Sequence, residues 1–240
     1  MRLRCAIVKA EPEACAVRLY IMLYIIRKKE GCGVKYRHII FDVDGTIADT
    51  EYAVLKSLQD VVRIRLGREM SFEELRFVKG IPGWEAFRQL GFAEKDFAQV
   101  MREWESGMRA MNDRITIFSG AAELVDALAA SGCYLGIATS KTRDQYIKDF
   151  ERFDVSARFA VSVTCEDTDD PKPGAGPLLE YMKRTGAKPQ EMLYIGDAVY
   201  DAMTAKAAGV DFALAVWGAT EEIEAKYLPK HPLQLLDMIR

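Results

Sequence analysis

The amino-acid sequence predicts an α/β protein: a doubly wound, mainly parallel sheet flanked by helices, with a helical domain inserted after the first strand. Short apolar runs that end in polar residues alternate with segments of helical periodicity, as strands and helices alternate in a parallel sheet. One long stretch, residues 51–118, has helical periodicity alone. We therefore expect a core domain built from residues 34–50 and 119–240, and a helical cap domain at 51–118.

Composition limits the class of partner. The chain has 240 residues, of which 50% are hydrophobic, and a formal net charge of -3. This length is enough for a core with a smaller inserted domain. Because Lys and Arg are not in excess, we expect a small-molecule partner and no nucleic acid, and the oligomeric state stays open. The 5 cysteines are scattered without metal-ligand spacing, which indicates reduced thiols and a cytoplasmic protein.

Residues 1–33 precede the first predicted core strand. Their apolar segment, residues 16–26, is interrupted by Arg18 and is much shorter than the roughly 20 residues that span a bilayer. We therefore expect neither a transmembrane helix nor a signal peptide, and no membrane partner. We also expect the native chain to start near Val34, which would make residues 1–33 an extension outside the native protein.

The first predicted strand runs from His38 toward Val43 and is apolar enough to be buried on both faces of a parallel sheet. It ends in two carboxylates, Asp42 and Asp44, and Gly45 then permits a turn. In open α/β sheets this carboxyl edge is where ligands bind. Because two carboxylates one residue apart repel, a metal ion beside them would keep both ionised. The stretch therefore predicts a magnesium site.

The run Asp42-Val43-Asp44-Gly45-Thr46 after an apolar strand resembles the first motif of the haloacid dehalogenase-like (HAD) hydrolases, which have a Rossmann-like core. The resemblance implies that Asp42 is the nucleophile and forms an aspartyl-phosphate, and that Asp44 is the general acid and then the base. It further implies that Gly45 and Thr46 help to bind phosphate. Asp44 excludes the dehalogenase branch, whose chemistry needs no acid at this place.

The inserted stretch is predicted to be helical because apolar side chains recur at spacings of three and four. The expected helices cover residues 54–62, 72–78, 84–90 and 97–104. The run Gly80-Ile81-Pro82-Gly83 breaks the pattern, and the resemblance implies that Gly80 faces the substrate phosphate in a cap over the core. We expect Trp84, Phe87 and Trp104 to pack inside the insertion rather than to contact a ligand.

The α/β rhythm returns at Ser119, which we expect to cap a helix over residues 121–130. A second strand, residues 134–138, then ends at Thr139 and Ser140. A hydroxyl at a strand end, beside a helix N-terminus, binds phosphate oxygens without adding negative charge. The resemblance assigns that role to Thr139, with Ser140 beside it, whereas from the residues alone either hydroxyl could simply cap the next helix.

A third strand, residues 159–163, leads into an acidic loop and Pro171-Lys172-Pro173. The two prolines restrain the backbone on both sides of Lys172. The resemblance implies that Lys172 holds the nucleophile and neutralises phosphoryl oxygens; by itself it would be read as an exposed lysine in a charged loop. Ala175 and Gly176 stand where the family usually has a proline and an acidic residue, so the resemblance does not fix the shape of this loop.

The fourth strand, residues 192–195, ends in Gly196-Asp197, with Asp201 one helical turn later. The resemblance implies that Asp197 binds Mg²⁺ together with Asp42 and the backbone carbonyl of Asp44, and that Asp201 supports the site through Lys172 or a metal-bound water. Oxygen ligands of this kind suit Mg²⁺. A fifth strand over residues 212–217 and a terminal helix over 232–240 complete the predicted core.

In this order along the chain, the motifs look most like those of phosphoglycolate phosphatases, so we expect a magnesium-dependent phosphatase acting on a small phosphorylated metabolite. Two alternatives remain. A sugar-phosphate mutase of the β-phosphoglucomutase type shares the core residues but carries a histidine in its first cap helix, whereas the two histidines here, His38 and His231, lie outside residues 51–118. A non-catalytic phosphate-binding protein could use the same scaffold, although the intact set of acidic and basic residues argues against it.

Overall fold

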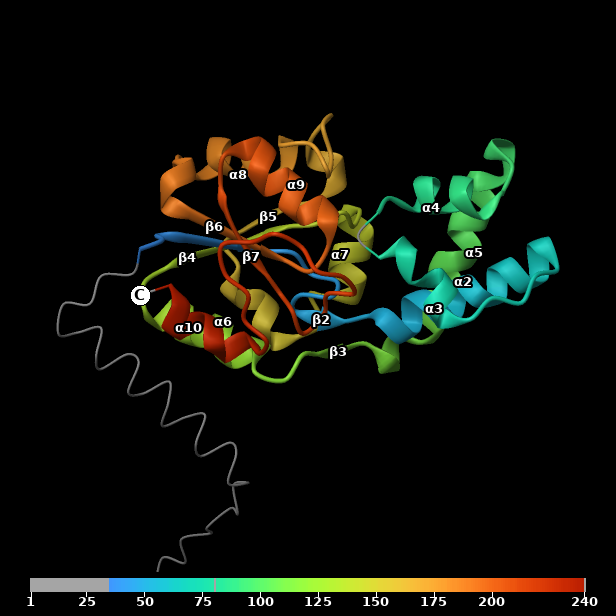
Figure 1. The fold of residues 1–240 in the computed structure, drawn as a ribbon, viewed down its shortest axis with the longest axis horizontal. Helices are drawn as coiled ribbons and strands as arrows, with labels where there is room; N and C mark the ends of the chain where they lie inside the picture. The colour runs from blue at the N-terminus through green and yellow to red at the C-terminus, as the bar shows by residue number, and fades with distance from the viewer. Residues whose placement is uncertain (1–34, 80, 240) are drawn as a thin grey trace, which may run out of the picture.

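The computed structural model describes residues 35–79 and 81–239. The expected start of the chain near Val34 and the expected phosphate-facing position of Gly80 lie outside these residues. Figure 1 shows a sheet with helices on both of its faces and, to one side, a helical part joined to it through neighbouring segments. This is the predicted α/β architecture with a helical insertion.

The central sheet is entirely parallel and has the strand order β5-β4-β1-β6-β7. Its strands are β1 (His38–Phe41), β4 (Tyr134–Ala138), β5 (Val161–Val163), β6 (Met192–Gly196) and β7 (Asp211–Leu214). Phe41 of the middle strand pairs with Ile137 on one side and Ile195 on the other. Because the three strands end in register, the residues that follow β1, β4 and β6 meet at one edge of the sheet. Both β5 and β7 are shorter than predicted.

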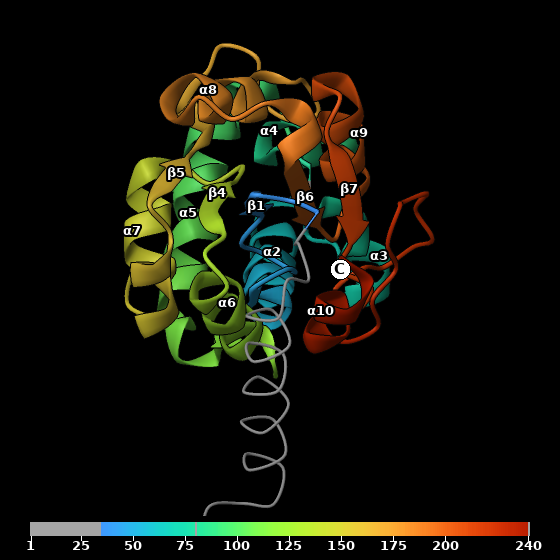
Figure 2. The same ribbon diagram turned by 90° about the vertical axis from the view of Figure 1, so that its left-hand side faces the viewer.

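Helices cover both faces of the sheet, which is what buries β1 completely. They are α6 (Ala121–Ala130), α7 (Arg143–Asp149), α8 (Gly176–Thr185), α9 (Val199–Ala208) and α10 (Leu235–Met238). Figure 2 shows α8 and α9 over one face, with α6 and α10 over the other. Ile39 and Phe41 pack into the hydrophobic cluster on the α6 face, and Ile40 packs into the cluster on the α8 face. The alternation follows from the two-residue period of a strand.

The insertion has a hydrophobic core of its own. It consists of α2 (Glu51–Leu66), α3 (Phe72–Leu75), α4 (Gly83–Leu90) and α5 (Phe97–Ala110), with α2 packed on α5. Phe87 and Trp104 are buried there, as expected. Trp84 is 50% exposed, so its predicted packing inside the insertion was wrong. Its ring lies under the Arg88 guanidinium, 5.1 Å from ring centroid to Cζ, and this contact one helical turn along α4 keeps both side chains at the surface.

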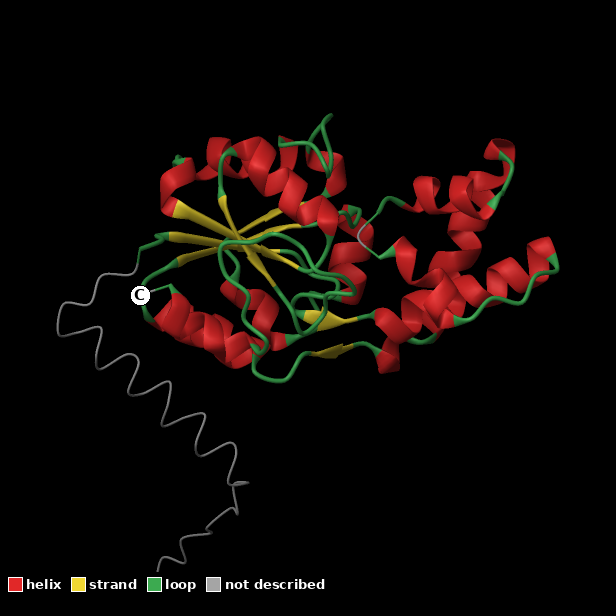
Figure 3. Ribbon diagram, in the orientation of Figure 1, coloured by secondary structure: helices red, strands yellow, loops and turns green. Residues whose placement is uncertain are grey.

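Two short antiparallel strands, β2 (Ala48–Asp49) and β3 (Thr116–Ile117), connect the insertion to the core. Figure 3 shows them beside the carboxyl edge of the large sheet. The Gly45 N–H donates a hydrogen bond to the Ala48 carbonyl at 2.9 Å. The insertion is therefore anchored directly to the turn that follows Asp44.

The helix α6 starts differently from the prediction. Its N-cap residue is Gly120, at φ 83°, and no side chain caps the helix, so the prediction that Ser119 is the cap was wrong. A Cβ on Gly120 would overlap the His231 ring, so the left-handed turn also makes room for the C-terminal segment. That segment is a 3₁₀ turn, Pro232–Gln234, followed by the short α10, instead of one continuous helix.

Among the described residues, no helix is both long enough and apolar enough to cross a lipid bilayer.

Candidate active site

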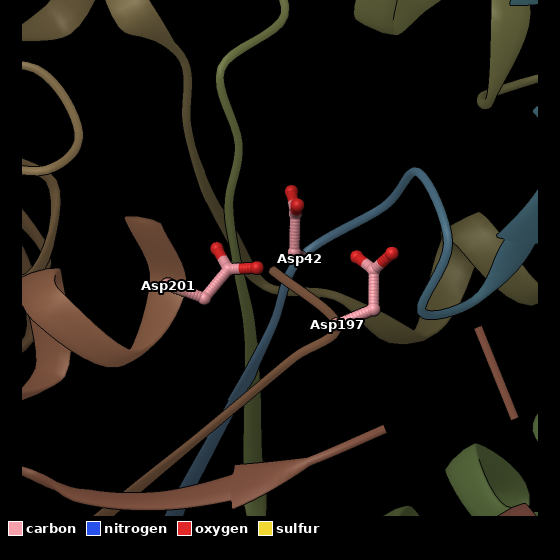
Figure 4. A group of neighbouring side chains, drawn as sticks. All are labelled: Asp42, Asp197 and Asp201. Atoms are coloured by element: carbon pink, nitrogen blue, oxygen red, sulfur yellow. The ribbon is translucent and has the colours of Figure 1, made fainter. Parts of the chain in front are cut away.

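Three buried carboxylates meet at the carboxyl edge of the sheet. Asp42 follows β1, Asp197 follows the neighbouring β6, and Asp201 lies in the first turn of α9. One carboxylate oxygen from each lies within 4.8 Å of the others, and Figure 4 shows the three side chains around one small space. The Asp42 N–H donates to the Ile195 carbonyl at 2.8 Å, so sheet pairing itself fixes the backbone of this cluster.

Lys172 is buried between two of these carboxylates. Its Nζ lies 2.6 Å from Asp201 Oδ1 and 3.2 Å from Asp42 Oδ1. Asp201 also accepts hydrogen bonds from the Tyr194 hydroxyl at 2.8 Å and from the Ala198 N–H at 3.1 Å. Both Asp201 oxygens are thus engaged by donors, which suits a residue that holds Lys172 in place. Asp42 Oδ1 is buried and accepts no hydrogen bond, so Lys172 meets it only as an ion pair.

Burial dominates the electrostatics of the cluster. It raises the pKa of Asp42 to about 7, against the opposing effect of Lys172, with Asp201 and Asp44 raising it further. It also raises the pKa of Asp197 well above its usual value, and Asp201 adds to the effect. Burial acts to lower the pKa of Lys172, but Asp201 and Asp42 outweigh it, so the net shift is upward. The three carboxylates share the Lys172 ammonium and, at a longer distance from Asp197, that of Lys79, so negative charge is in excess.

These residues fit a divalent cation. The donors are carboxylate oxygens, the kind of ligand that hard cations prefer, and Asp42 Oδ1 is a buried acceptor without a hydrogen-bond donor. Gly45 is at φ 71°, and a Cβ there would overlap the Asp197 carboxylate, so the turn can lie this close only as glycine. Thr46 Oγ1 donates to Asp197 Oδ1 at 3.5 Å. Asp42 and Asp197 are accordingly the side chains that could hold a metal ion.

Asp44 contacts a second lysine that the sequence interpretation missed. Lys141 Nζ lies 3.2 Å from Asp44 Oδ2 and 3.0 Å from Asp149 Oδ2, and only 9% of the Lys141 side chain is exposed. Asp44 Oδ1 is buried without a hydrogen-bond partner. The only signal in the sequence was the position of Lys141 directly after Thr139 and Ser140.

The two hydroxyls predicted at the end of β4 have different surroundings. Thr139 is buried, and its Oγ1 accepts a hydrogen bond from the Lys141 N–H at 3.3 Å. By the sheet register it lies beside the residue that follows Asp42. Ser140 is exposed at the same edge. Thr139 is therefore the better placed of the two to reach a ligand among the carboxylates.

Lys79, which lies in the insertion, brings a cation to this edge, and the sequence interpretation missed it as well. Lys79 Nζ donates to the Gly218 carbonyl at 2.7 Å and to Glu51 Oε2 at 3.1 Å, and lies 3.7 Å from Asp197 Oδ2. It also lines a cavity of about 540 Å³ between the insertion and the core, together with Gly45 and Trp217. Its position immediately before Gly80, the start of the break between two helices, was the available signal.

The family model described as haloacid dehalogenase-like hydrolase matches residues 39–215. The pyrophosphatase PpaX of Bacillus velezensis is 29% identical over 184 residues, which cover 75% of this chain and 82% of the relative. The phosphoglycolate phosphatase of Xylella fastidiosa is 28% identical over 186 residues, which cover 76% and 81%.

Solved structures share the same architecture. A provisionally assigned phosphoglycolate phosphatase from Lactobacillus plantarum has a TM-score of 0.80 at 29% identity, with 85% of this chain and 99% of that one covered. A haloacid dehalogenase superfamily hydrolase of subfamily IA from Geobacter sulfurreducens has a TM-score of 0.67 at 25% identity, with 88% and 99% covered. The carboxylates and lysines described above all lie inside the region that the family model matches.

Proposed function

The chain belongs to the haloacid dehalogenase-like hydrolase family, and from that premise we propose that it is a Mg²⁺-dependent phosphatase of small phosphorylated metabolites that uses Asp42 as its nucleophile. The observation that carries the proposal is the placement of Asp42, buried between the Lys172 ammonium and the Asp197 carboxylate, with Asp44 two residues further along the chain. A nucleophile, a cation and a candidate proton donor thereby share one edge of the sheet.

In the first half of the proposed reaction, an Asp42 oxygen attacks phosphorus and the bond to the leaving oxygen breaks. The electron pair of that bond stays on the leaving oxygen, which takes a proton from Asp44 and departs as an alcohol. In the second half, water attacks the aspartyl-phosphate and gives a proton to Asp44. The Asp42–phosphorus bond breaks, which restores the carboxylate and releases inorganic phosphate.

Charge stabilisation accompanies both steps. Lys172 reduces the repulsion between the Asp42 carboxylate and the phosphoryl oxygens, and Thr139 is proposed to donate a hydrogen bond to one of them. The side chains of Asp42 and Asp197, with the carbonyl of Asp44, would hold Mg²⁺. A bound Mg²⁺ supplies positive charge against the phosphoryl oxygens. Gly45 and Thr46 are proposed to shape the phosphate site, and Asp201 to keep Lys172 in place.

Two classes of substrate are candidates for the proposed phosphatase activity. We propose a small metabolite of the phosphoglycolate type, in line with the Xylella fastidiosa relative. Pyrophosphate is the second candidate, because the Bacillus velezensis pyrophosphatase matches the chain to a similar extent. The mutase alternative has little support, since His38 lies in β1 and His231 packs against Gly120, both outside the insertion. Comparing kcat/KM for 2-phosphoglycolate and for pyrophosphate would rank the two classes.

The purified protein should release phosphate from p-nitrophenyl phosphate when Mg²⁺ is present and should lose that activity when the metal is chelated. The reason is that the excess negative charge around Asp42 would otherwise repel the phosphoryl dianion. Colorimetric detection of p-nitrophenol measures the reaction. Binding of inorganic phosphate without any turnover of this or other phosphate esters would instead support the non-catalytic alternative.

Mg²⁺ should bind more weakly as the pH falls below about 7. Burial raises the pKa of Asp42 to about 7 in the metal-free protein, above the value of about 3.9 expected in the unfolded chain. Below a pH of about 7 the metal-free folded protein holds a proton on Asp42 that Mg²⁺ must displace, so the affinity for Mg²⁺ should fall by up to ~10-fold for each pH unit. Titrations followed by thermal unfolding at pH 6, 7 and 8 measure this. An affinity independent of pH would contradict it, and Asp197→Asn should show no Mg²⁺-dependent shift.

A further inference from the structure

Asp44 is at one end of a row of three charged side chains, followed by Lys141 and Asp149. The proposed reaction uses only Asp44. Lys141 touches Asp44 on one side and Asp149, the last residue of α7, on the other. Only 9% of the Lys141 side chain and 13% of the Asp149 side chain are exposed. Burying a lysine is costly unless it is paired, so both carboxylates matter to where its ammonium lies.

The two contacts of Lys141 differ in kind. Its Nζ donates a hydrogen bond to Asp149 Oδ2 at 3.0 Å, whereas at 3.2 Å from Asp44 Oδ2 it forms an ion pair without hydrogen-bond geometry. Asp149 is therefore the anchor of the ammonium. The anchor is itself held firmly, because α7 begins with a capping box between Thr142 and Gln145 and buries Tyr146 against the core.

The contact with Lys141 leaves the two oxygens of Asp44 unequal. Oδ2 faces the ammonium, while Oδ1 is buried and has no hydrogen-bond partner. The Asp44 side chain is nevertheless 36% exposed, so any access to its carboxyl oxygens is through Oδ2, the oxygen that Lys141 contacts. An ammonium held at a fixed point beside that oxygen sets the direction in which it meets a reacting atom, which is what general acid catalysis requires.

We propose that Asp149 is a positioning residue for the phosphatase reaction: it anchors Lys141, which in turn holds Asp44 in the orientation that protonates the leaving oxygen. This inference rests on the proposed function, in which Asp44 donates that proton. Without Asp149, Asp44 is the remaining carboxylate partner of the Lys141 ammonium. The ammonium would then move closer to Asp44 and turn the proton-donating oxygen of Asp44 away from the substrate.

The test compares two esters of similar shape, p-nitrophenyl phosphate and phenyl phosphate. The p-nitrophenolate ion departs with little need of a proton, whereas phenolate, a stronger base, depends on the acid. The quantity to measure is kcat/KM, because it covers the steps up to loss of the leaving group and excludes hydrolysis of the aspartyl-phosphate. We expect Asp149→Asn to lower kcat/KM by ~10-fold or more for phenyl phosphate and by less than ~3-fold for p-nitrophenyl phosphate.

A matched control is available on the same helix. Asp144 pairs with Lys148 at the surface of α7, so Asp144→Asn should leave kcat/KM unchanged for both esters. Lys141→Met removes the lysine between Asp44 and Asp149 and should also lower kcat/KM more for phenyl phosphate than for p-nitrophenyl phosphate. This variant tests the positioning role if Asp149→Asn does not fold.

The outcomes separate the two proposals. If the wild-type protein hydrolyses neither of these esters, nor 2-phosphoglycolate or pyrophosphate, in Mg²⁺, the proposed function fails. If the wild-type protein hydrolyses both esters, and the folded Asp149→Asn variant loses the same factor on each or loses nothing, the positioning role is overturned. An equal loss on both esters is what a merely structural role would give.

Discussion

Asp42→Asn should reduce turnover by at least ~10⁴-fold, the order of loss found when an enzyme nucleophile is removed. An amide cannot attack phosphorus as a carboxylate does, and Lys172 and Asp197 cannot replace it. The fold should survive, because burial already disfavours the charged form of Asp42 and raises its pKa to about 7. Steady-state assays with p-nitrophenyl phosphate, together with thermal unfolding, measure both effects. We expect an unfolding temperature equal to or above that of the wild-type protein.

The Asp42→Asn experiment has a matched control and a direct chemical readout. Asp60, on α2, pairs with Lys56 and Arg63 near the surface, so Asp60→Asn should retain full turnover. Acid quenching of the wild-type reaction should trap phosphate covalently on the protein. A variant lacking Asp42 that still turns over substrate, or that still carries trapped phosphate, would show that another group is the nucleophile.

The sheet could be predicted from local patterns, and the carboxylate cluster from those patterns together with the resemblance of its motifs to those of the HAD hydrolases. Asp42 and Asp197 directly follow apolar strands, and the carboxyl ends of neighbouring parallel strands necessarily meet. The sequence pattern could not give the strand order, yet any order that makes β1 and β6 neighbours brings these two side chains together. The structure has that order.

Lys79 and Lys141 could not be predicted as site residues, because their contacts depend on tertiary structure. Lys79 reaches the site from the insertion, and its contact with Asp197 depends on how the insertion sits against the core, which no short-range pattern encodes. Lys141 was visible in the motif, but its partners became clear only once α7 brought Asp149 back toward the end of β4. Pairings made through space by long flexible side chains leave no periodic trace in a sequence.

The errors in the predicted secondary structure are local and occur where a few residues are compatible with two different structures. A serine before a helix usually caps it, but at Ser119 the chain places Gly120 in the left-handed region, where a larger residue would also meet His231. The strands β2 and β3 each have two residues, too few to show alternation. Tertiary contacts decide both cases: His231 of the C-terminal segment at Gly120, and the pairing of β2 with β3 at the base of the insertion.

Lys172→Met should cost both activity and stability. It leaves Asp201 Oδ1 without its ammonium and leaves Asp42 facing Asp197 and Asp201 with no buried cation between them. Breaking a buried ion pair by removing one partner typically costs about 3–5 kcal/mol, which for a domain of this size lowers the unfolding temperature by about 10 °C. We expect turnover to fall by ~10³-fold, because the phosphoryl oxygens lose their opposing charge. Thermal unfolding and steady-state assays measure the two losses.

A second substitution separates the two roles of Lys172. In Lys172→Met with Asp201→Asn, the unpaired charge on Asp201 is gone. The amide oxygen can still accept from the Ala198 N–H, and the amide N–H can donate to the Tyr194 hydroxyl, which itself donates to the Ala138 carbonyl, so most of the lost stability should return. Turnover should stay as low as in the single variant, because nothing restores a positive charge beside Asp42. Recovery of turnover together with stability would mean that Lys172 only holds the site together. Recovery of stability alone would place the ammonium in the chemistry, since the fold then no longer depends on it.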